Sequence, residues 1–460
     1  MIKRLSALVA LAAALVGLVL LAPHFNLTVG ELPKADVLSV KAQDLKLVCP
    51  GGVYRTGGAA GTKVGSFEAI GSPEINSDFN GPAGTSMLIS GNQLTAVDPA
   101  GRAEQNSILL NANQLQSIQT DGLAGLTGAG CQRPTNDLWF VGGDNSTGRE
   151  SLLVVKNVTK VDSTVSLEIF NERGLVTGSG MSGISVAAGK TTVIPLSSYA
   201  PKTKTFSTHL VSRGGLVAAW IQEKVVRGLA AGGVDYVSPS AAFATTQAIP
   251  GVFIRGSADA AKLMANSDFS DLVPTLRVFV PGQKSATVTA QVLGSTAKTF
   301  GTVVRQTIAG GTTADIALPG LQDGDFVAIV KSDAPVGASI RLHRVVKSKV
   351  DFAWLSSAQP QTAKVGFTVP TSGISKLSVA NPGSADLTLN LSQNGGAETS
   401  FKVPAAGQLT LKFAPGSKLQ LSTGKSLFFA TMIVDVDGSV SAIPVLDYKN
   451  PGGQVAVMVR

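Results

Sequence analysis

The sequence predicts an all-β protein built from tandem immunoglobulin-like β-sandwich domains, and three observations support this fold class. Short segments alternate apolar and polar residues, as in TVSLEIF, ATVTAQV and DLTLNLS, which is typical of half-buried strands. Turn signals recur about every 8 to 12 residues, the spacing of a sandwich. The chain also holds 51 glycines and only 15% charged residues, as expected of many short strands joined by tight turns.

Three stretches of the chain follow the same order, and we interpret each as one sandwich. They begin LLVVKNVTKVDSTVSLEIFNERG, LRVFVPGQKSATVTAQVLG and KLSVANPGSADLTLNLSQNGG, and continue into VAAGKTTVIPL, IAGGTTADIAL and PAAGQLTLKFA. Each stops at an Asp-aromatic pair: Asp235-Tyr236, Asp351-Phe352 and Asp447-Tyr448. We interpret this pair as a corner in which the aromatic ring packs and the aspartate accepts hydrogen bonds from nearby backbone amides; a shared ligand site is the alternative.

Domain boundaries are placed where this pattern lapses. Linkers are expected at SPSAAFATTQAIPG and SSAQPQTAKVG, and one short helix at SADAAKLMANSDF. A less regular, β-rich segment precedes the repeats. The predicted domains are residues 1–25 (signal anchor or signal peptide), 37–135 (N-terminal β-rich region with a disulfide), 136–240, 252–355 and 365–450 (the three sandwiches).

The N-terminus has the plan of an export signal, because Lys3 and Arg4 precede an apolar run from Leu5 to Ala22. The run is long for a signal-peptide core and suits a short membrane span. We expect an uncleaved anchor, with a cleaved signal peptide as the alternative. Positive residues before the span place the rest of the chain outside the cytoplasm in either case. The predicted location is therefore the plasma membrane, single-pass, or secretion if the signal is cleaved.

Cys49 and Cys131 are the only two cysteines. In an exported protein two cysteines most simply form one disulfide, which would close a loop of roughly 80 residues. Two cysteines are too few for a zinc site or a redox motif, so the sequence predicts a structural bridge, with two unpaired thiols as the alternative.

The formal charge of +8 permits anionic partners. The densest basic cluster is RLHRVVKSK, a possible polyanion contact formed by Arg341, His343, Arg344, Lys347 and Lys349. The alternative interpretation is an exposed edge strand kept soluble by its charges. Nucleic acid is not expected as a partner, given the predicted location.

Patterns typical of catalysis are weak in this sequence. It contains no G-x-S-x-G elbow, and its S-x-x-K matches, STAK and STGK, lie in turn-like segments. His209 and His343 each stand alone, which disfavours an imidazole-based metal site. We therefore expect no enzyme activity, no catalytic residues, no cofactor and no metal.

Several segments, in their order along the chain, carry a family resemblance. After the apolar run come CPGG, CQRPTNDLWFVGG, LLVVKN, GGVDYVSPS and AIPG. The set resembles an actinobacterial family of exported, membrane-anchored envelope proteins with a domain of unknown function. One departure is Tyr236, where that pattern has Trp. The resemblance implies an envelope location and a β architecture, and it implies no reaction.

The function expected from these observations is that of a non-catalytic cell-envelope protein, a membrane-anchored extracytoplasmic binding or scaffolding module. Its expected partner is an envelope protein or an anionic wall polymer. One alternative is an accessory subunit of an envelope glycan-assembly system containing a glycosyltransferase. A second, disfavoured by the missing catalytic constellation, is an extracytoplasmic hydrolase.

Overall fold

The computed structural model describes residues 36–40, 44–57, 65–97, 108–120, 122–294, 301–446 and 453–457. The chain divides into two units, residues 1–42 with 452–460, and residues 43–451. In the first unit β1 (Asp36–Val40) pairs antiparallel with β34 (Gly453–Val457). The predicted anchor, residues 1–25, lies outside the described residues. None of the helices in the described ranges has the length and apolar character needed to cross a membrane.

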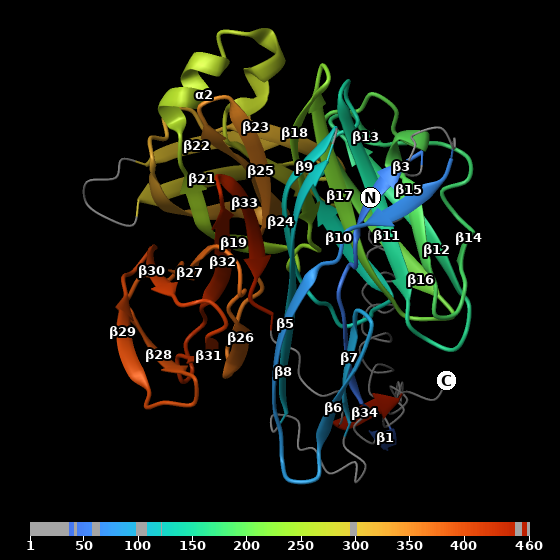
Figure 1. Cartoon of the computed structure of the whole chain (residues 1–460), viewed down its shortest axis with the longest axis vertical. Helices are drawn as coiled ribbons and strands as arrows, with labels where there is room; N and C mark the ends of the chain where they lie inside the picture. The colour runs from blue at the N-terminus through green and yellow to red at the C-terminus, as the bar shows by residue number, and fades with distance from the viewer. Residues whose placement is uncertain are drawn as a thin grey trace, which may run out of the picture. The chain divides into compact units, whose positions relative to one another are not determined.

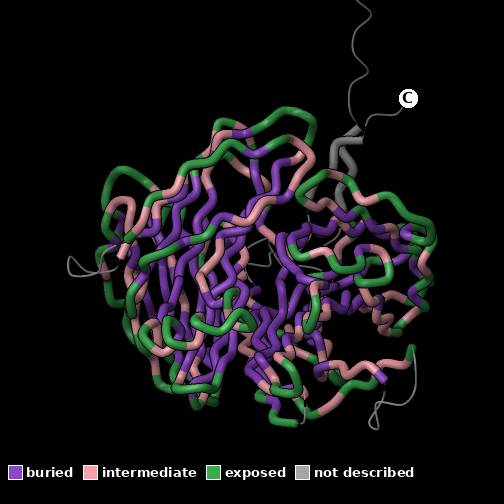
Figure 2. The backbone as a smooth tube through the Cα atoms, turned by 90° about the horizontal axis from the view of Figure 1, so that it is seen from above, coloured by how far each residue is buried: buried purple, intermediate pink, exposed green. Residues whose placement is uncertain are grey.

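The second unit is built almost entirely of antiparallel sheets, which confirms the predicted all-β sandwich fold class (Figure 1). Buried residues follow the strands and exposed residues gather in the connecting loops (Figure 2). This distribution is what period-2 alternation produces when one face of each strand packs into a core.

The N-terminal segment forms three small sheets, with the orders β2-β7-β6, β3-β4 and β5-β8-β9. The predicted disulfide is present: it joins Cys49, just after β2, to Cys131, just after β9, within a small apolar core. The strands are β2 (Leu45–Val48), β3 (Val53–Thr56), β4 (Phe67–Ile70), β5 (Glu74–Asn80), β6 (Ser86–Ser90), β7 (Gln93–Val97), β8 (Leu109–Thr120) and β9 (Leu123–Gly130).

The first sandwich pairs the sheet β10-β16-β12-β13, with β14 also on β12, against the sheet β15-β11-β17-β18. Apolar side chains from both sheets form its core. Its elements are β10 (Asp137–Val141), β11 (Arg149–Asn157), β12 (Ser163–Asn171), β13 (Gly174–Leu175), β14 (Ile184–Val186), β15 (Thr191–Pro195), η2 (Leu196–Ser198), β16 (Phe206–Arg213), β17 (Val217–Arg227) and β18 (Ala230–Val237).

The second sandwich is organised by one very long strand, β24, which pairs with β19 and β21 along its first half and with β20 and β25 along its second. The predicted linker SPSAAFATTQAIPG is corrected here, because its second half is strand β19. The expected helix is present as α2 (Ser257–Leu263) and η3 (Ser267–Leu272). The strands are β19 (Ala244–Ile254), β20 (Thr275–Val280), β21 (Ala286–Gly294), β22 (Thr302–Ile308), β23 (Thr312–Ala317), β24 (Gly324–Val346) and β25 (Lys349–Ser356).

The third sandwich repeats the strand order of the first, with sheets β26-β31-β28-β29 and β30-β27-β32-β33. Its last hairpin corrects the sequence alignment: β33 corresponds to β18 and β25, so Ser441, not Asp447, faces Asp235. Asp447 lies outside the described residues. The strands are β26 (Val365–Thr368), β27 (Ile374–Asn381), β28 (Leu387–Gln393), β29 (Thr399–Val403), β30 (Gly407–Phe413), β31 (Lys418–Ser422), β32 (Phe429–Val436) and β33 (Ser439–Pro444).

Four edge strands, one from each part of the second unit, meet around a common centre: β9, β18, β25 and β33. Strand β18 contacts both β9 and β25, and β33 contacts the same two strands, so the four close into a ring. The Asp-aromatic pairs of β18 and β25 therefore lie between sandwiches, not at a corner within one.

Asp235 and Asp351 bind this ring of strands together. Asp235 accepts hydrogen bonds from the Trp354 amide at 2.9 Å and from the Ser441 hydroxyl at 2.6 Å. The Asp351 carboxylate accepts from the amides of Leu126, in β9, and Val440, in β33. The predicted aspartate-to-amide bonding is thus present, but the amides belong to other parts of the chain.

Candidate functional site

The predicted polyanion contact is corrected for Arg341 and His343, which are only 3% and 6% exposed. They lie on β24, an interior strand, so neither the polyanion interpretation nor the exposed-edge interpretation fits them. Arg344 is half-buried and pairs with Asp435 at 2.9 Å. Lys347 and Lys349 are exposed at the turn between β24 and β25. A polyanion contact through these last three residues stays a prediction.

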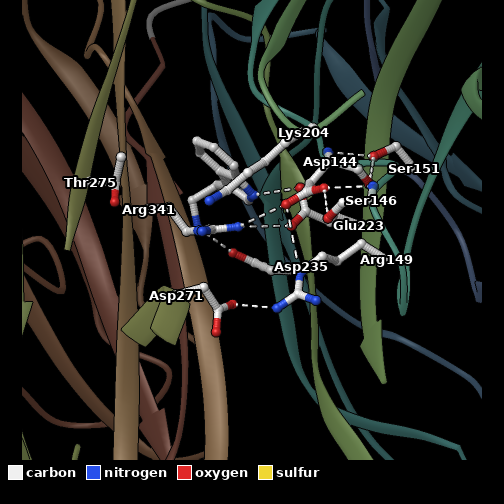
Figure 3. Close-up of polar contacts among 12 residues, drawn as sticks. Asp144, Ser146, Arg149, Ser151, Lys204, Glu223, Asp235, Asp271, Thr275 and Arg341 are labelled. Carbon is white, nitrogen blue, oxygen red and sulfur yellow. Dashed lines mark hydrogen bonds and ion pairs between the residues drawn. The ribbon is translucent and has the colours of Figure 1, made fainter. Parts of the chain in front are cut away.

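Arg341 points into a polar cluster between the first and second sandwiches (Figure 3). Its Nη1 lies 3.5 Å from Asp144 Oδ2 and 3.8 Å from Glu223 Oε1. Both carboxylates are fully buried. Asp144 is held by the loop after β10, where it accepts bonds from the Ser146 amide and hydroxyl. The cluster therefore places a guanidinium of the second sandwich beside two buried carboxylates of the first, where Arg149 also lies 3.7 Å from Asp144.

Glu223 projects from β17 toward the second sandwich, where the Trp354 indole donates to it at 3.1 Å. Burial raises the pKa of Glu223 to about 7, although Arg341 acts in the opposite direction. Arg277, on β20, forms a bidentate pair with Asp315 at 2.7 and 2.9 Å. Its guanidinium also lies 5.0 Å from the centre of the Trp354 ring. Carboxylates of the first sandwich and guanidinium groups of the second thus lie side by side along the interface between these two sandwiches; we refer to this row of charges as the wall.

Asp271, just before β20, extends this wall to the surface. Arg149 donates to it at 2.7 Å, and Arg227 donates to both of its oxygens at 2.7 and 3.0 Å. The two guanidinium groups hold the pKa of Asp271 well below its usual value, despite its partial burial. His343 lies behind this carboxylate at 3.9 Å, and burial lowers the pKa of its imidazole to about 3, so His343 is neutral.

A polar cleft of about 570 Å³ opens beside Asp271, between loops of the two sandwiches. Its lining combines basic side chains, two aspartates and small hydroxyl residues. The residues are Ser146, Thr147, Gly148, Arg149, Lys204, Val226, Arg227, Gly228, Ser267, Asp268, Ser270 and Asp271. We refer to it as the inter-sandwich cleft.

One cationic group of this cleft contacts no carboxylate among the described residues, the exposed Lys204 ammonium. Arg227 differs, because both of its Nη atoms donate to Asp271 and its Nε is buried. No histidine or cysteine occurs among the lining residues. Within the described ranges, no group of three or more His, Cys, Asp or Glu side chains is arranged to hold a metal ion. The cleft thus has a polar lining with hydroxyl groups and one exposed ammonium.

Sequence reasoning missed the residues that build this site. Asp144, Glu223 and Arg277 each interrupt an otherwise apolar or small-residue stretch: WFVGGDNS, VAAWIQEKVV and TLRVFV. A charged residue inside a buried segment is rarely tolerated without a partner. That signal was available, but the identity of each partner depended on how the sandwiches face one another.

The fold and the site define a multi-sandwich, all-β protein with a polar cleft at a junction between sandwiches. The chain belongs to the family described as "Family of unknown function (DUF5719)", which matches residues 91–416. No curated protein matches the chain. A solved structure described as a tetra-tandem repeat in the extending region of a large adhesion protein shows 11% identity, over 84% of this chain and 91% of that one, with a TM-score of 0.11. At that score the likeness carries no argument.

Proposed function

We propose that this protein is a non-catalytic binding module of the cell envelope, anchored by residues 1–25 with its sandwiches outside the cytoplasm. The basic residues before the apolar run support this location. The disulfide between Cys49 and Cys131 also fits an oxidising compartment. An actinobacterial source is part of the same proposal and rests on the resemblance of the quoted segments.

The ligand we propose is an anionic, hydroxylated wall polymer, and the inter-sandwich cleft is the observation that carries this proposal. Lys204 offers an exposed ammonium that contacts no carboxylate among the described residues. Ser146, Ser267 and Ser270 add hydroxyls of the kind that bond to sugar or glycerol groups. The network of buried charges behind the cleft fixes its walls, so little ordering is needed on binding.

Binding of a soluble poly(glycerol phosphate) probe to the full-length protein tests the proposal. We expect saturable binding that weakens as salt increases, and no binding of uncharged dextran. Lys204→Gln should weaken binding roughly tenfold, the effect of about 1.4 kcal/mol. Lys202→Gln is the matched control, because Lys202 is an exposed lysine two residues away that does not line the cleft.

Equal affinity of the two variants, or no binding of the polyanion by the native protein, would overturn the proposal. A second role is distinguishable in the same preparation. Co-purification with a membrane glycosyltransferase after crosslinking in intact cells would favour the accessory-subunit alternative.

A further inference from the structure

Strand β6 is an exposed edge strand with an unusual sequence, SMLIS. It pairs on one side with β7 in the sheet β2-β7-β6, and no described residue pairs with its other side. Leu88 and Ile89 are 60% and 58% exposed, and as consecutive strand residues they lie on opposite faces. Among the described residues of the second unit, the outer edge of β6 is therefore unpaired and Leu88 and Ile89 are exposed, while Met87 packs against the small apolar core.

The protection that edge strands usually carry is missing from β6. Natural edge strands avoid pairing by means of charged side chains, proline or bulges. Other exposed edges of this protein follow that rule, with Arg305 in β22, Lys402 in β29 and Lys412 in β30. The stretch from Gly84 to Gly91, in contrast, contains neither a charge nor a proline.

The outer edge offers main-chain groups in a defined register. The β6–β7 hairpin closes at Ser90 opposite Gln93, across a two-residue Gly91–Asn92 turn. The closing pair of such a turn is hydrogen-bonded within the hairpin, so alternate residues, Met87 and Ile89, direct their amides and carbonyls outward.

The sequence of β6 is complementary to itself when reversed. In an antiparallel pair centred on Leu88, Ser86 meets Ser90, Met87 meets Ile89 and Leu88 meets its own counterpart. In this register the outward-facing Met87 and Ile89 lie opposite each other, so each pair exchanges both main-chain bonds. No like charges oppose one another, and like charges directly opposite would destabilise such a pair.

We propose that β6 is a self-association edge, where a second copy of this chain adds antiparallel across a two-fold axis at Leu88. The two β2-β7-β6 sheets then become one continuous sheet. Ile89 of each copy covers the half-buried Met87 of the other, and the two Leu88 side chains meet on the opposite face. A contact of five residues per copy is small, so the association is weak and reversible.

Disulfide trapping with Leu88→Cys in the full chain tests this proposal. The native cysteines are bonded to each other, so this variant carries one free thiol. Residues at a non-hydrogen-bonded antiparallel position have Cα atoms about 4.5 Å apart, which suits a disulfide. We expect covalent dimers to form at least tenfold faster than with Leu229→Cys, whose parent residue is 98% exposed and lies outside β6.

A charge variant gives a second readout that does not depend on trapping. Leu88→Lys places two like charges opposite each other and should abolish the concentration-dependent rise in mass seen by sedimentation, whereas Leu229→Lys should leave it unchanged. Equal trapping rates for the two cysteine variants, or a native chain that stays monomeric up to high concentration, would overturn the proposal. Trapping of a different protein at Leu88→Cys would overturn it too, by assigning β6 to another partner. None of these results depends on polymer binding at the inter-sandwich cleft.

Discussion

Asp351 shows how much single residues contribute at the centre of this fold. Its side chain is buried among four strands and accepts amide hydrogen bonds from β9 and β33. Two glycines leave it space: a Cβ at Gly125 or at Gly233 would come within 2.7 or 2.6 Å of its Oδ1. Both glycines have positive φ, so no other residue fits well at either position.

Burial raises the pKa of Asp351 to about 7, well above the 3.8 of an ordinary aspartate, and this shift makes stability depend on pH. Because the folded pKa is above the unfolded one, the stabilising contribution of the protonated form is complete below about pH 4 and is lost as pH rises through 7. Asp351→Asn stays neutral. Relative to the native protein it should therefore gain on the order of 2 to 4 kcal/mol of unfolding free energy between pH 4 and pH 8, measured by urea denaturation.

Asp437→Asn is the control for this titration. Asp437 occupies an exposed turn with φ of 50°, a conformation that asparagine tolerates. It reports how a surface substitution alone alters urea unfolding in the same pH series. If the Asp351→Asn difference did not change between pH 4 and pH 8, Asp351 would be ionised in the folded protein and its raised pKa would be wrong.

Residue patterns indicated this centre only in part. The repeated Asp-aromatic pair was visible in the sequence, and so was the expectation that its aspartate accepts backbone amides. The donors could not be predicted, because Leu126 is 225 positions from Asp351 and Ser441 is 206 positions from Asp235. The cluster of Asp144, Glu223 and Arg341 was missed for the same reason: its members are separate in sequence and meet only after two sandwiches have packed.

At the scale of elements, the sequence patterns predicted individual strands better than they predicted the segments that connect the domains. Alternation identified β12, β21 and β28, because each packs one face into a sandwich core. It failed for β19, where Pro250 and neighbouring small residues resemble a linker. Pro250 is tolerated within this strand because a bulge beside it interrupts the pairing with β24. The N-terminal segment was predicted only as β-rich, since its sheets are small and irregular.

The disulfide is the element-level device that holds the N-terminal segment together. It joins the ends of β2 and β9, and its cysteines are separated by 82 residues, within a small core to which the described residues contribute nine buried side chains, the two cysteines included. The double variant Cys49→Ala with Cys131→Ala should lose about 4 kcal/mol in the chain-entropy account. We expect faster amide hydrogen exchange in β2, β7, β8 and β9, the strands that surround the bridge.

Thiol chemistry provides the control for that variant. The native folded protein should react with no thiol reagent until it is reduced, and should then expose two thiols per chain. Free thiols in the folded, unreduced protein, or exchange that is unchanged in the double variant, would contradict a stabilising bridge.

At the scale of the whole second unit, the sandwiches are not independent domains, because they share core side chains. The core of the second sandwich includes Ile433, Val440 and Ala442 from the third. The core of the third includes Leu115 and Leu126 from the N-terminal segment. Together with the ring of β9, β18, β25 and β33, this sharing predicts that the unit unfolds cooperatively, although its strands read as separate repeats in sequence.

The three tryptophans allow this cooperativity to be measured, since Trp139, Trp220 and Trp354 all lie in the first two sandwiches. Met432→Ala removes a fully buried side chain from the third sandwich and should cost about 2 to 5 kcal/mol. If the sandwiches are coupled, tryptophan fluorescence will report a lower urea midpoint even though no tryptophan touches the third core. Ile374→Ala, at a half-exposed position of the same sandwich, should leave that midpoint nearly unchanged. A circular dichroism transition that moves earlier while the tryptophan transition stays fixed would instead mean that the third sandwich unfolds alone. In that case the shared side chains and the Asp235–Ser441 bond would contribute little to its stability.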